Sequence, residues 1–498
     1  MTQSTSEVQG AESAVSSAPT ASGSRRLVDH LSPKLVAVLT VLGFGLPVIG
    51  YFWFLEHYSV NTIIGDQWDD VNIIKQSYVH FFDWGPMWAQ HYENRIFFPN
   101  IIVVLLAHAV HFNIRVEENL GAVMLVVATI FIIWAHKRRS PSTPWLYYCP
   151  AAILGLSIVQ YGNTIWGFQL AWYMVLLSLA TGVLLLDRVN LTWITLVGAL
   201  AAAVVGSFSS LQGLLIWPVG LVLLYFRRRP LPQLGVWIAV AAASIVLYFR
   251  GYRFSESPFP QYARHHLLAA LRFFLFAIGD VVGKPVGLGT SSPDNNLVIL
   301  FGFVIVVLAV ATIVICGLRR DESSGSPVGV ALICYGLLFA ALVTQGRSFL
   351  GLGGASFSRY TTFDILILVG IYLALLDRRP HPLDQGQLKT NLSGSLPSNP
   401  HRHSRRARRW LDRVALPCAQ IVLLVAIAIQ IPFGIYHGVQ GGRNQYVFDA
   451  KAATVLRNID HAPNGEVSFY LFFLEPPAST RDRARVLEEH HLSLFANG

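Results

Sequence analysis

Three carboxylates stand within five residues of one another in the segment Gly65-Asp66-Gln67-Trp68-Asp69-Asp70. Ionised carboxylates this close repel one another, and apolar surroundings add to the effect, so the pKa of at least one of them is expected to rise. Such a group can take a proton from a hydroxyl as a general base, while another orients the hydroxyl or holds a cation. A solvated acidic loop has the same composition. The segment therefore predicts either a site for acid–base chemistry or a plain acidic loop.

A second polar group follows in His91-Tyr92-Glu93-Asn94-Arg95, shortly before Pro99 and an apolar run. One interpretation is that these side chains cap the start of an apolar helix, where Glu and Asn are ordinary residues. The other is that His91 and Arg95 face the aspartates, or that Arg95 binds a phosphate through its planar set of donors. In the second case His91 and Glu93 are candidate contacts for a substrate.

Amides and aromatic rings are concentrated between residues 160 and 169, in a short stretch that separates two apolar runs. Amides bind hydroxyl groups, and aromatic faces pack on the apolar faces of other rings. Asn163, Trp166 and Gln169 are therefore candidate contacts for a sugar. A plain turn with aromatic residues at the membrane interface is the alternative.

Arg347 and Arg359 flank a glycine-rich stretch that leads into an apolar run near residue 361. Backbone N–H groups at a helix start, the helix dipole and arginine together make a good anion site, for example for a phosphate. Tyr360 can donate a further hydrogen bond to such a ligand. The alternative is a structural ion pair between Arg359 and Asp364, five residues apart.

The elements that must position these residues are membrane helices. Of the 498 residues, 53% are hydrophobic and only 13% are charged, whereas about a quarter of a soluble protein is charged. This composition excludes a soluble enzyme, and the apolar blocks are too long for a β-barrel. We predict an all-α polytopic membrane protein with about eleven spans, near residues 35–55, 119–136, 145–160, 168–186, 191–206, 211–226, 232–249, 296–317, 327–345, 361–376 and 414–436.

The net charge of +9 comes largely from Lys and Arg at the ends of apolar runs. Such clusters set orientation in the bilayer, so we expect no nucleic-acid partner. Eleven spans with a cytoplasmic N-terminus place 137–139 and 227–229, among others, on the cytoplasmic side of the plasma membrane and the C-terminus outside. Counting 97–112 as a further span would break this pattern. We therefore predict that 97–112 is a helix along the outer interface, starting at Pro99.

The predicted organisation has three parts. Residues 1–26 form a disordered cytoplasmic tail, 27–436 the membrane domain, and 437–498 an outer tail or small cap. The membrane domain has long outer loops over 56–118 and 251–295 and a basic cytoplasmic linker over 377–413. The tail contains a strand-like run over 467–474 and a charged, helix-like stretch from Thr480 to His490.

This arrangement resembles the GT-C superfamily of glycosyltransferases that use polyprenyl-phosphate-linked sugars. Relatives include the O-mannosyltransferase-like, aminoarabinose transferase-like and actinobacterial mannosyl- or arabinosyltransferase-like enzymes. By motif the resemblance rests on the three aspartates, the group from His91 to Arg95 with Pro99, and Arg359-Tyr360. Asp-Asp stands here in place of the Asp-Glu of the O-mannosyltransferases, and a single proline in place of the Pro-Pro-Leu of the aminoarabinose type. The subfamily, and therefore the sugar, stays open.

The resemblance implies a GT-C-like fold and a catalytic base at Asp69 or Asp70, with Asp66 as the alternative. The base deprotonates an acceptor hydroxyl, which displaces the carrier from the anomeric carbon with inversion. The acceptor is a glycan, a lipid or a protein. A divalent metal between the aspartates stays open, because no set of His ligands accompanies them.

The resemblance also implies where the phosphate of the donor binds. Arg359, with Arg347 or Arg95, would hold the charge that develops on the departing polyprenyl phosphate, with Tyr360 donating a hydrogen bond. Two other functions compete: a lipid or glycan transporter or flippase, and a polymerase or ligase of lipid-linked glycans. A transporter is expected to carry charges near the centres of its spans, whereas this chain has them near span ends.

Overall fold

The computed structural model describes residues 31–253, 259–284, 293–318, 326–376 and 414–496. Helices dominate this part of the chain. Its two strands, β1 (Gln90–His91) and β2 (Asn94–Arg95), form a short antiparallel hairpin. The tail predicted over 1–26 and the linker predicted over 377–413 lie outside the described residues.

Within the described residues, eight helices are long and apolar enough to cross a membrane. Each coincides with one of the predicted spans, which confirms a multi-pass, all-helical membrane protein. They are α1 (Pro33–Tyr58), α5 (Ile114–Arg139), α8 (Leu170–Leu186) with the turn before it, α11 (Leu231–Phe249), α14 (Pro293–Leu318), α15 (Val328–Arg347), α17 (Thr361–Leu376) and α20 (Leu416–Arg457).

The other three predicted spans are shorter or broken helices. They are α9 (Trp193–Ser207), α10 (Ile216–Phe226) with the turn before it, and a chain of three pieces, η3 (Trp145–Tyr148), α6 (Cys149–Gly155) and η4 (Ile158–Gln160). The 15 residues of α9 cover only about 22 Å at ~1.5 Å per residue. The number of eleven spans therefore stays a prediction.

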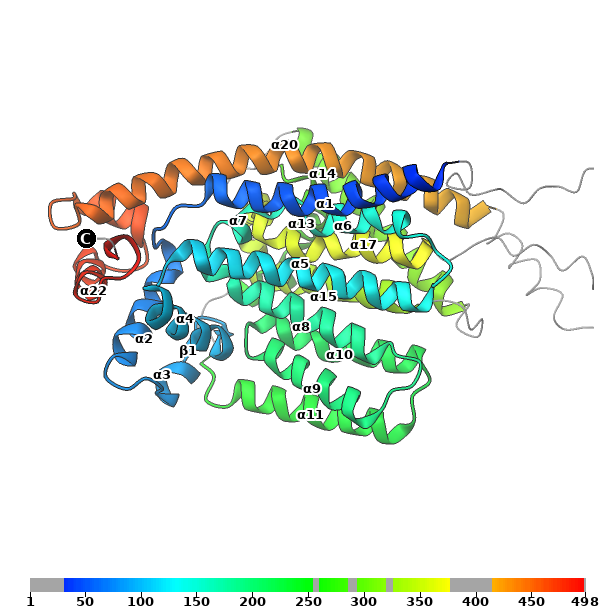
Figure 1. The fold of residues 1–498 in the computed structure, drawn as a ribbon, viewed down its shortest axis with the longest axis horizontal. Helices are drawn as coiled ribbons and strands as arrows, with labels where there is room; N and C mark the ends of the chain where they lie inside the picture. The colour runs from blue at the N-terminus through cyan, green and yellow to red at the C-terminus, as the bar shows by residue number, and fades with distance from the viewer. Residues whose placement is uncertain (1–30, 254–258, 285–292, 319–325, 377–413, 497–498) are drawn as a thin grey trace, which may run out of the picture.

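The long helices lie side by side along the longest axis of the molecule (Figure 1). One end of the bundle carries α2 (Asp70–Ser77), α3 (Trp84–Trp88), α4 (Phe97–Val110) and α22 (Pro477–Glu489). We call it the loop end. The opposite end, where α1 begins, carries the arginines of 138–139 and 227–229, and we call it the basic end.

The predicted interfacial helix is α4, which begins at Phe97, two residues before Pro99, and has 14 residues. It lies beside α2 and α3 at the loop end (Figure 1). The side chain of Trp68, in the first loop, is fully buried in a second apolar core with Val71 and Phe112, and side chains of the C-terminal segment belong to the same core.

We define the C-terminal segment as residues 458–496. It contains α21 (Asn464–Glu466), a helical turn over Val467–Leu471 and α22. The charged helix predicted near its end is confirmed as α22, but the strand predicted over 467–474 is wrong. Val467 and Leu471 bury their side chains from a single helical turn into the same core as Trp68.

The segment predicted as a second outer loop contains two helices among its described residues, α12 (Phe259–His265) and α13 (Leu267–Gly279). α13 packs closely on α14, since a Cβ added at Gly279 would come within 2.0 Å of the Val298 carbonyl. A packed helix thus replaces much of the expected loop.

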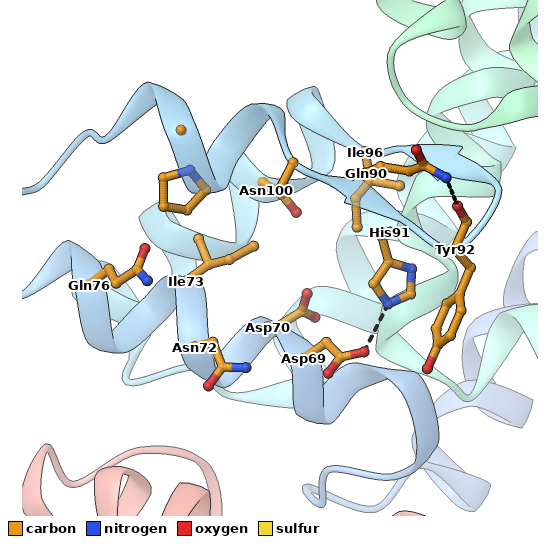
Figure 2. Close-up of a pocket in the computed structure, with 13 residues that line it drawn as sticks. Asp69, Asp70, Asn72, Ile73, Gln76, Gln90, His91, Tyr92, Ile96 and Asn100 are labelled. Carbon is orange, nitrogen blue, oxygen red and sulfur yellow. Dashed lines mark hydrogen bonds and ion pairs between the residues drawn. The ribbon is translucent and has the colours of Figure 1, made fainter. Parts of the chain in front are cut away.

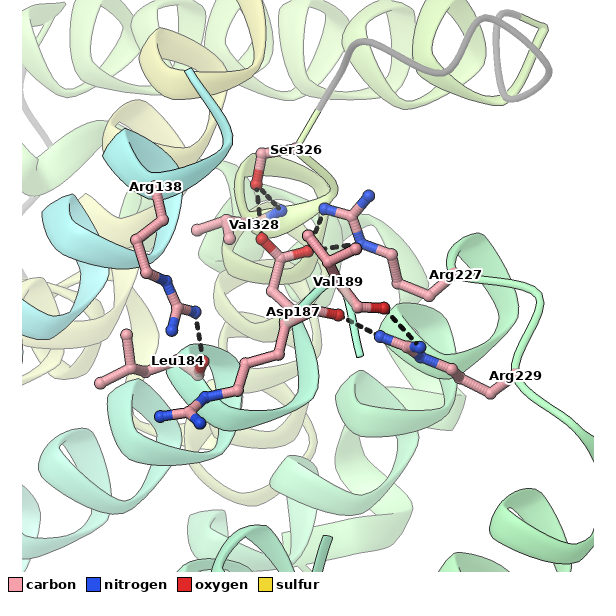
Figure 3. Close-up of polar contacts among 9 residues, drawn as sticks. Arg138, Leu184, Asp187, Val189, Arg227, Arg229, Ser326 and Val328 are labelled. Atoms are coloured by element: carbon pink, nitrogen blue, oxygen red, sulfur yellow. Dashed lines mark hydrogen bonds and ion pairs between the residues drawn. The ribbon is translucent and has the colours of Figure 1, made fainter. Parts of the chain in front are cut away.

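At the basic end, the buried Asp187 ties three elements together (Figure 3). Arg227, after α10, donates to Asp187 Oδ1 through Nε at 2.6 Å and through Nη2. Ser326, before α15, donates to Oδ2 at 3.1 Å.

A second contact ties the short helices to the loop end. Ser210, which follows α9, donates to Asn94 of β2 at 2.9 Å. The short helices α9 and α10 therefore run between the two ends of the bundle.

Candidate active site

The aspartate loop is the turn η2 (Gly65–Asp69), which continues directly into α2. Gly65 has a φ of +56°, a value that glycine adopts without strain, and its α-carbon lies against the ring of Trp166. The indole Nε1 of Trp166 donates to the carbonyl of Ile64 at 3.3 Å. Trp166, predicted to contact a sugar, is here a support for the start of the aspartate loop.

Asp69 is held between an imidazole and a guanidinium from distant parts of the chain. His91 Nε2, on β1, lies 3.1 Å from Asp69 Oδ2, and Arg483 Nη1, on α22, lies 2.9 Å from Oδ1. The prediction that His91 faces the aspartates is therefore met by the geometry. Arg483 was not predicted, because 414 residues separate it from Asp69.

Asp70 is the most deeply buried of the three aspartates, with 2% exposure, and its Oδ2 has no hydrogen-bond partner among the described residues. Burial raises its pKa well above the ordinary value, and the nearby Glu117, Asp69 and Asp66 raise it further. Asp70 therefore keeps its proton to a higher pH than an ordinary aspartate.

Asp66 connects the aspartate loop to the arginine-bearing turn before α17. Burial raises its pKa, while the charges of His91 and Arg359 oppose that rise. Asp66 and Arg359 are therefore near enough to act on each other electrostatically.

A cavity of about 600 Å³ opens beside Asp69 and Asp70 (Figure 2). Its polar lining consists of carboxylates, amides, an imidazole and a phenol, groups that bind hydroxyls. The lining residues come from α2, the stretch around α3, the β-hairpin and α4: Asp69, Asp70, Asn72, Ile73, Gln76, Gly85, Pro86, Ala89, Gln90, His91, Tyr92, Ile96 and Asn100.

Arg347 and Arg359 differ in their partners. Arg347, at the end of α15, forms an ion pair with Glu93 of the hairpin. The guanidinium of Arg359 packs on the ring of Phe357 at 4.8 Å, and it forms no ion pair with any acidic group of the described chain. Of these two arginines, Arg359 is therefore the one whose positive charge is available to bind an anion.

The glycine-rich stretch between α15 and α17 folds as three short helical pieces, η8 (Ser348–Leu350), α16 (Gly351–Ala355) and η9 (Ser358–Tyr360). Asn163 fixes it in place, because its Nδ2 donates to the Arg359 carbonyl at 2.8 Å and to Thr362 Oγ1 at 2.7 Å. Asn163 is buried and therefore positions Arg359, in place of the sugar contact predicted for it.

No protein family and no curated protein matches this chain. Its structure is similar to a crystal structure of ArnT from Cupriavidus metallidurans bound to undecaprenyl phosphate, with a TM-score of 0.43 and 14% identity over 87% of this chain and 82% of that one. It is similar to the same degree to ArnT in the apo state, over 85% and 80% of the two chains.

Four other predicted residues lie in structural positions. Arg95 is buried, and its guanidinium donates to the carbonyls of Tyr248, Trp88 and Arg250 at 2.5, 2.9 and 2.7 Å. It therefore holds the hairpin to α11, and its donors are used by main-chain carbonyls. Tyr360, Gln169 and Asp364 are also buried.

The ring of Tyr360 stacks on Trp172 at 6.2 Å between centroids, inside an aromatic cluster. Both carboxylate oxygens of Asp364 lack a hydrogen-bond partner among the described residues. The structural ion pair between Arg359 and Asp364, given above as the alternative, therefore does not form. In the same part of the chain, no group of three or more His, Cys, Asp or Glu is placed to hold a metal ion. We therefore derive no step through a metal.

Proposed function

We propose that this protein is a membrane glycosyltransferase of the GT-C type, which moves a sugar from a polyprenyl-phosphate carrier to an acceptor hydroxyl. One observation carries the proposal. Asp69 lines an open cavity while its neighbour Asp66 interacts with Arg359, whose charge has no acidic partner at contact distance. A base and a phosphate-binding cation thus meet at one end of a membrane bundle.

Asp69 is the best-placed general base of the three aspartates. Its side chain is 25% exposed, whereas Asp70 is buried and holds its proton. Asp69 takes the proton of the acceptor hydroxyl, and the oxygen attacks the anomeric carbon. The bond from that carbon to the phosphate oxygen breaks with its electron pair, so the carrier leaves as a phosphate and the anomeric centre inverts.

The two substrates have separate places in this arrangement. Arg359, together with Arg347, stabilises the negative charge that develops on the departing phosphate. The amide-lined cavity between α2 and α4 accepts the hydroxyl-bearing acceptor, with His91 holding Asp69 in its orientation. Glu93 keeps Arg347 in place through their ion pair.

The orientation in the membrane is part of the proposal. The arginines at the basic end favour the cytoplasmic face, by the positive-inside rule. The N-terminus then lies in the cytoplasm and the aspartates lie at the outer surface of the plasma membrane. Donors at that surface are lipid-linked sugars, since nucleotide sugars stay in the cytoplasm.

The position of the buried acidic groups supports surface chemistry over transport. Glu117 and Asp364 each lie in the first turn of their helix, α5 and α17. A transporter or flippase would be expected to carry such groups near the middle of its spans, where they are costly and kept for function.

The proposal is tested with membranes that contain the wild type or the Asp69→Asn variant. They are incubated with radiolabelled polyprenyl-phosphate pentoses and hexoses, and the loss of label from the lipid is measured. We expect at least a hundredfold slower transfer by the variant, because a general base contributes about 10²- to 10⁴-fold. Asp482→Asn is the matched control, since Asp482 is exposed and pairs only with Arg485 in the described structure. Equal transfer by Asp69→Asn and the wild type would contradict the proposal.

A further inference from the structure

The C-terminal segment reaches the proposed base through a single side chain. Arg483 donates from Nη1 to Asp69 Oδ1 at 2.9 Å and to the carbonyl of Trp68 at 3.2 Å. Its Nη2 lies 3.4 Å from Glu475, and its guanidinium packs on the ring of Phe472 at 5.6 Å. The side chain is only 13% exposed. Arg483 is therefore held by four contacts, and two of them are to the aspartate loop.

The C-terminal segment is docked firmly enough to hold Arg483 in that place. The rings of Tyr78, after α2, and His490 stack with centroids 3.8 Å apart. The amide of Ser493 donates to the carbonyl of His111 at 2.8 Å. Leu487, one turn after Arg483, is fully buried in the core shared with the first loop.

The charges around Asp69 explain why it needs this contact. The groups that face it come from three elements and include both signs: Asp66 and Asp70 from its own loop, His91 and Tyr92 from the hairpin, and Arg483 with Glu475 from the C-terminal segment. The two neighbouring aspartates repel a negative charge on Asp69. Arg483 is in contact with Asp69 and carries a permanent positive charge that offsets this repulsion.

We infer that Arg483 is a positioning residue of the active site, which holds the Asp69 carboxylate in its orientation and opposite a permanent positive charge, so that the C-terminal segment completes the site. The inference rests on the proposed function, in which Asp69 is the base. It assigns to a segment after the last membrane helix a direct part in the reaction. Asp69 can take the proton of a hydroxyl only while its carboxylate points at that hydroxyl, and the 2.9 Å contact with Arg483 fixes the carboxylate.

Three arginines of α22 offer a built-in set of controls. Arg483 contacts Asp69. Arg481 donates to the carbonyls of Ile459 and Ala462 at 3.0 and 2.7 Å and holds only the C-terminal segment itself. Arg485 is exposed and pairs with Asp482 on the same helix. Substitution by Gln at each position therefore removes a different interaction. At Arg483 the contact with the base is lost, at Arg481 the bonds that hold the segment are lost, and at Arg485 only an exposed positive charge is lost.

The test measures sugar transfer against pH for the wild type and for Arg483→Gln, Arg483→Lys and Arg485→Gln. We expect Arg483→Gln to lower kcat about 10- to 100-fold near neutral pH and to move the acid limb of the profile up by about one pH unit or more. Arg483→Lys should recover part of the shift, and Arg485→Gln should follow the wild type. An Arg483→Gln profile with an unmoved acid limb would overturn the inference, whatever its effect on rate.

A second measurement needs no activity. Thermal unfolding in detergent is followed for Asp69→Asn, Arg483→Gln and the double variant. The contact predicts that Arg483→Gln lowers the unfolding temperature less in the Asp69→Asn background than in the wild type, and additive effects would overturn it. A wild type that transfers no sugar would instead contradict the proposed function, and the unfolding cycle would still decide the contact.

Discussion

The two ends of the bundle each hold a cluster of acidic and basic side chains, and the clusters are built differently. At the basic end, Asp187 is fully buried and both of its oxygens are occupied by Arg227 and Ser326 (Figure 3). The neighbouring Arg138 and Arg229 donate to main-chain carbonyls at helix ends. At the loop end, Asp66, Asp69 and Asp70 lie in one loop, and Asp69 and Asp70 line a cavity of about 600 Å³.

This difference separates a structural cluster from a reactive one. Where every acceptor has a donor and water is excluded, the charges hold helices together and have nothing left to bind. At the loop end Asp69 is 25% exposed and lines a cavity, and one oxygen of Asp70 has no hydrogen-bond partner among the described residues, so protons and ligands can be exchanged there. The contrast predicts that mutations at the loop end change activity, whereas mutations at the basic end change stability.

The largest expected effect is on catalysis at the loop end. Asp69→Asn should slow sugar transfer by about 10²- to 10⁴-fold, because the amide cannot take the proton of the acceptor. The unfolding temperature should change little, since the side chain keeps its size and part of its hydrogen bonding. Transfer rate and thermal unfolding are measured on the same preparation. The comparison requires a loss of transfer rate with little change of unfolding temperature.

The matched substitution at the basic end should have the opposite profile. Asp187→Asn leaves Arg227 without its buried counter-charge, which typically costs about 3–5 kcal/mol of stability. Thermal unfolding in detergent should detect this loss, while kcat per folded molecule stays near the wild-type value. A selective loss of kcat without loss of stability would break the comparison.

The donor side should show an intermediate effect. Arg359→Gln is expected to raise KM for the polyprenyl-phosphate sugar or to lower kcat by about 10- to 100-fold, the equivalent of one charged hydrogen bond of ~1.5–3 kcal/mol. Arg347→Gln should have a smaller effect, because Arg347 is paired with Glu93 and more than a third exposed. Equal effects of the two variants would contradict the assignment of the unpaired guanidinium to the phosphate.

The smallest effect concerns the pH dependence of stability. Burial raises the pKa of Asp70 in the folded protein, so its contribution to stability is complete below the ordinary aspartate pKa and is lost as the pH rises through the raised value. Asp70→Asn has no proton to lose, and the difference in unfolding temperature between variant and wild type should grow in favour of the variant with rising pH. A constant difference from acid to neutral pH would contradict a raised pKa.

Part of the site could be predicted from the sequence. The aspartates and His91 lie in one loop between apolar runs, so a short connection limits how far apart they can be. Other predictions failed because they treated polar residues near a helix end as free to bind ligands. Arg95 and Asn163 are used by main-chain carbonyls instead, since buried carbonyls that lack a donor are costly.

The length of the apolar runs and the clustering of charge are local properties, and they were enough to predict a bundle of membrane helices with an acidic loop after the first of them. The packing in three dimensions was needed to show which aspartate is exposed, which arginine can bind an anion, and that Arg483 contacts Asp69 across 414 residues. Burial and ion pairing depend on which segments pack together. No local pattern in this chain encodes the docking of α22 on the first loop.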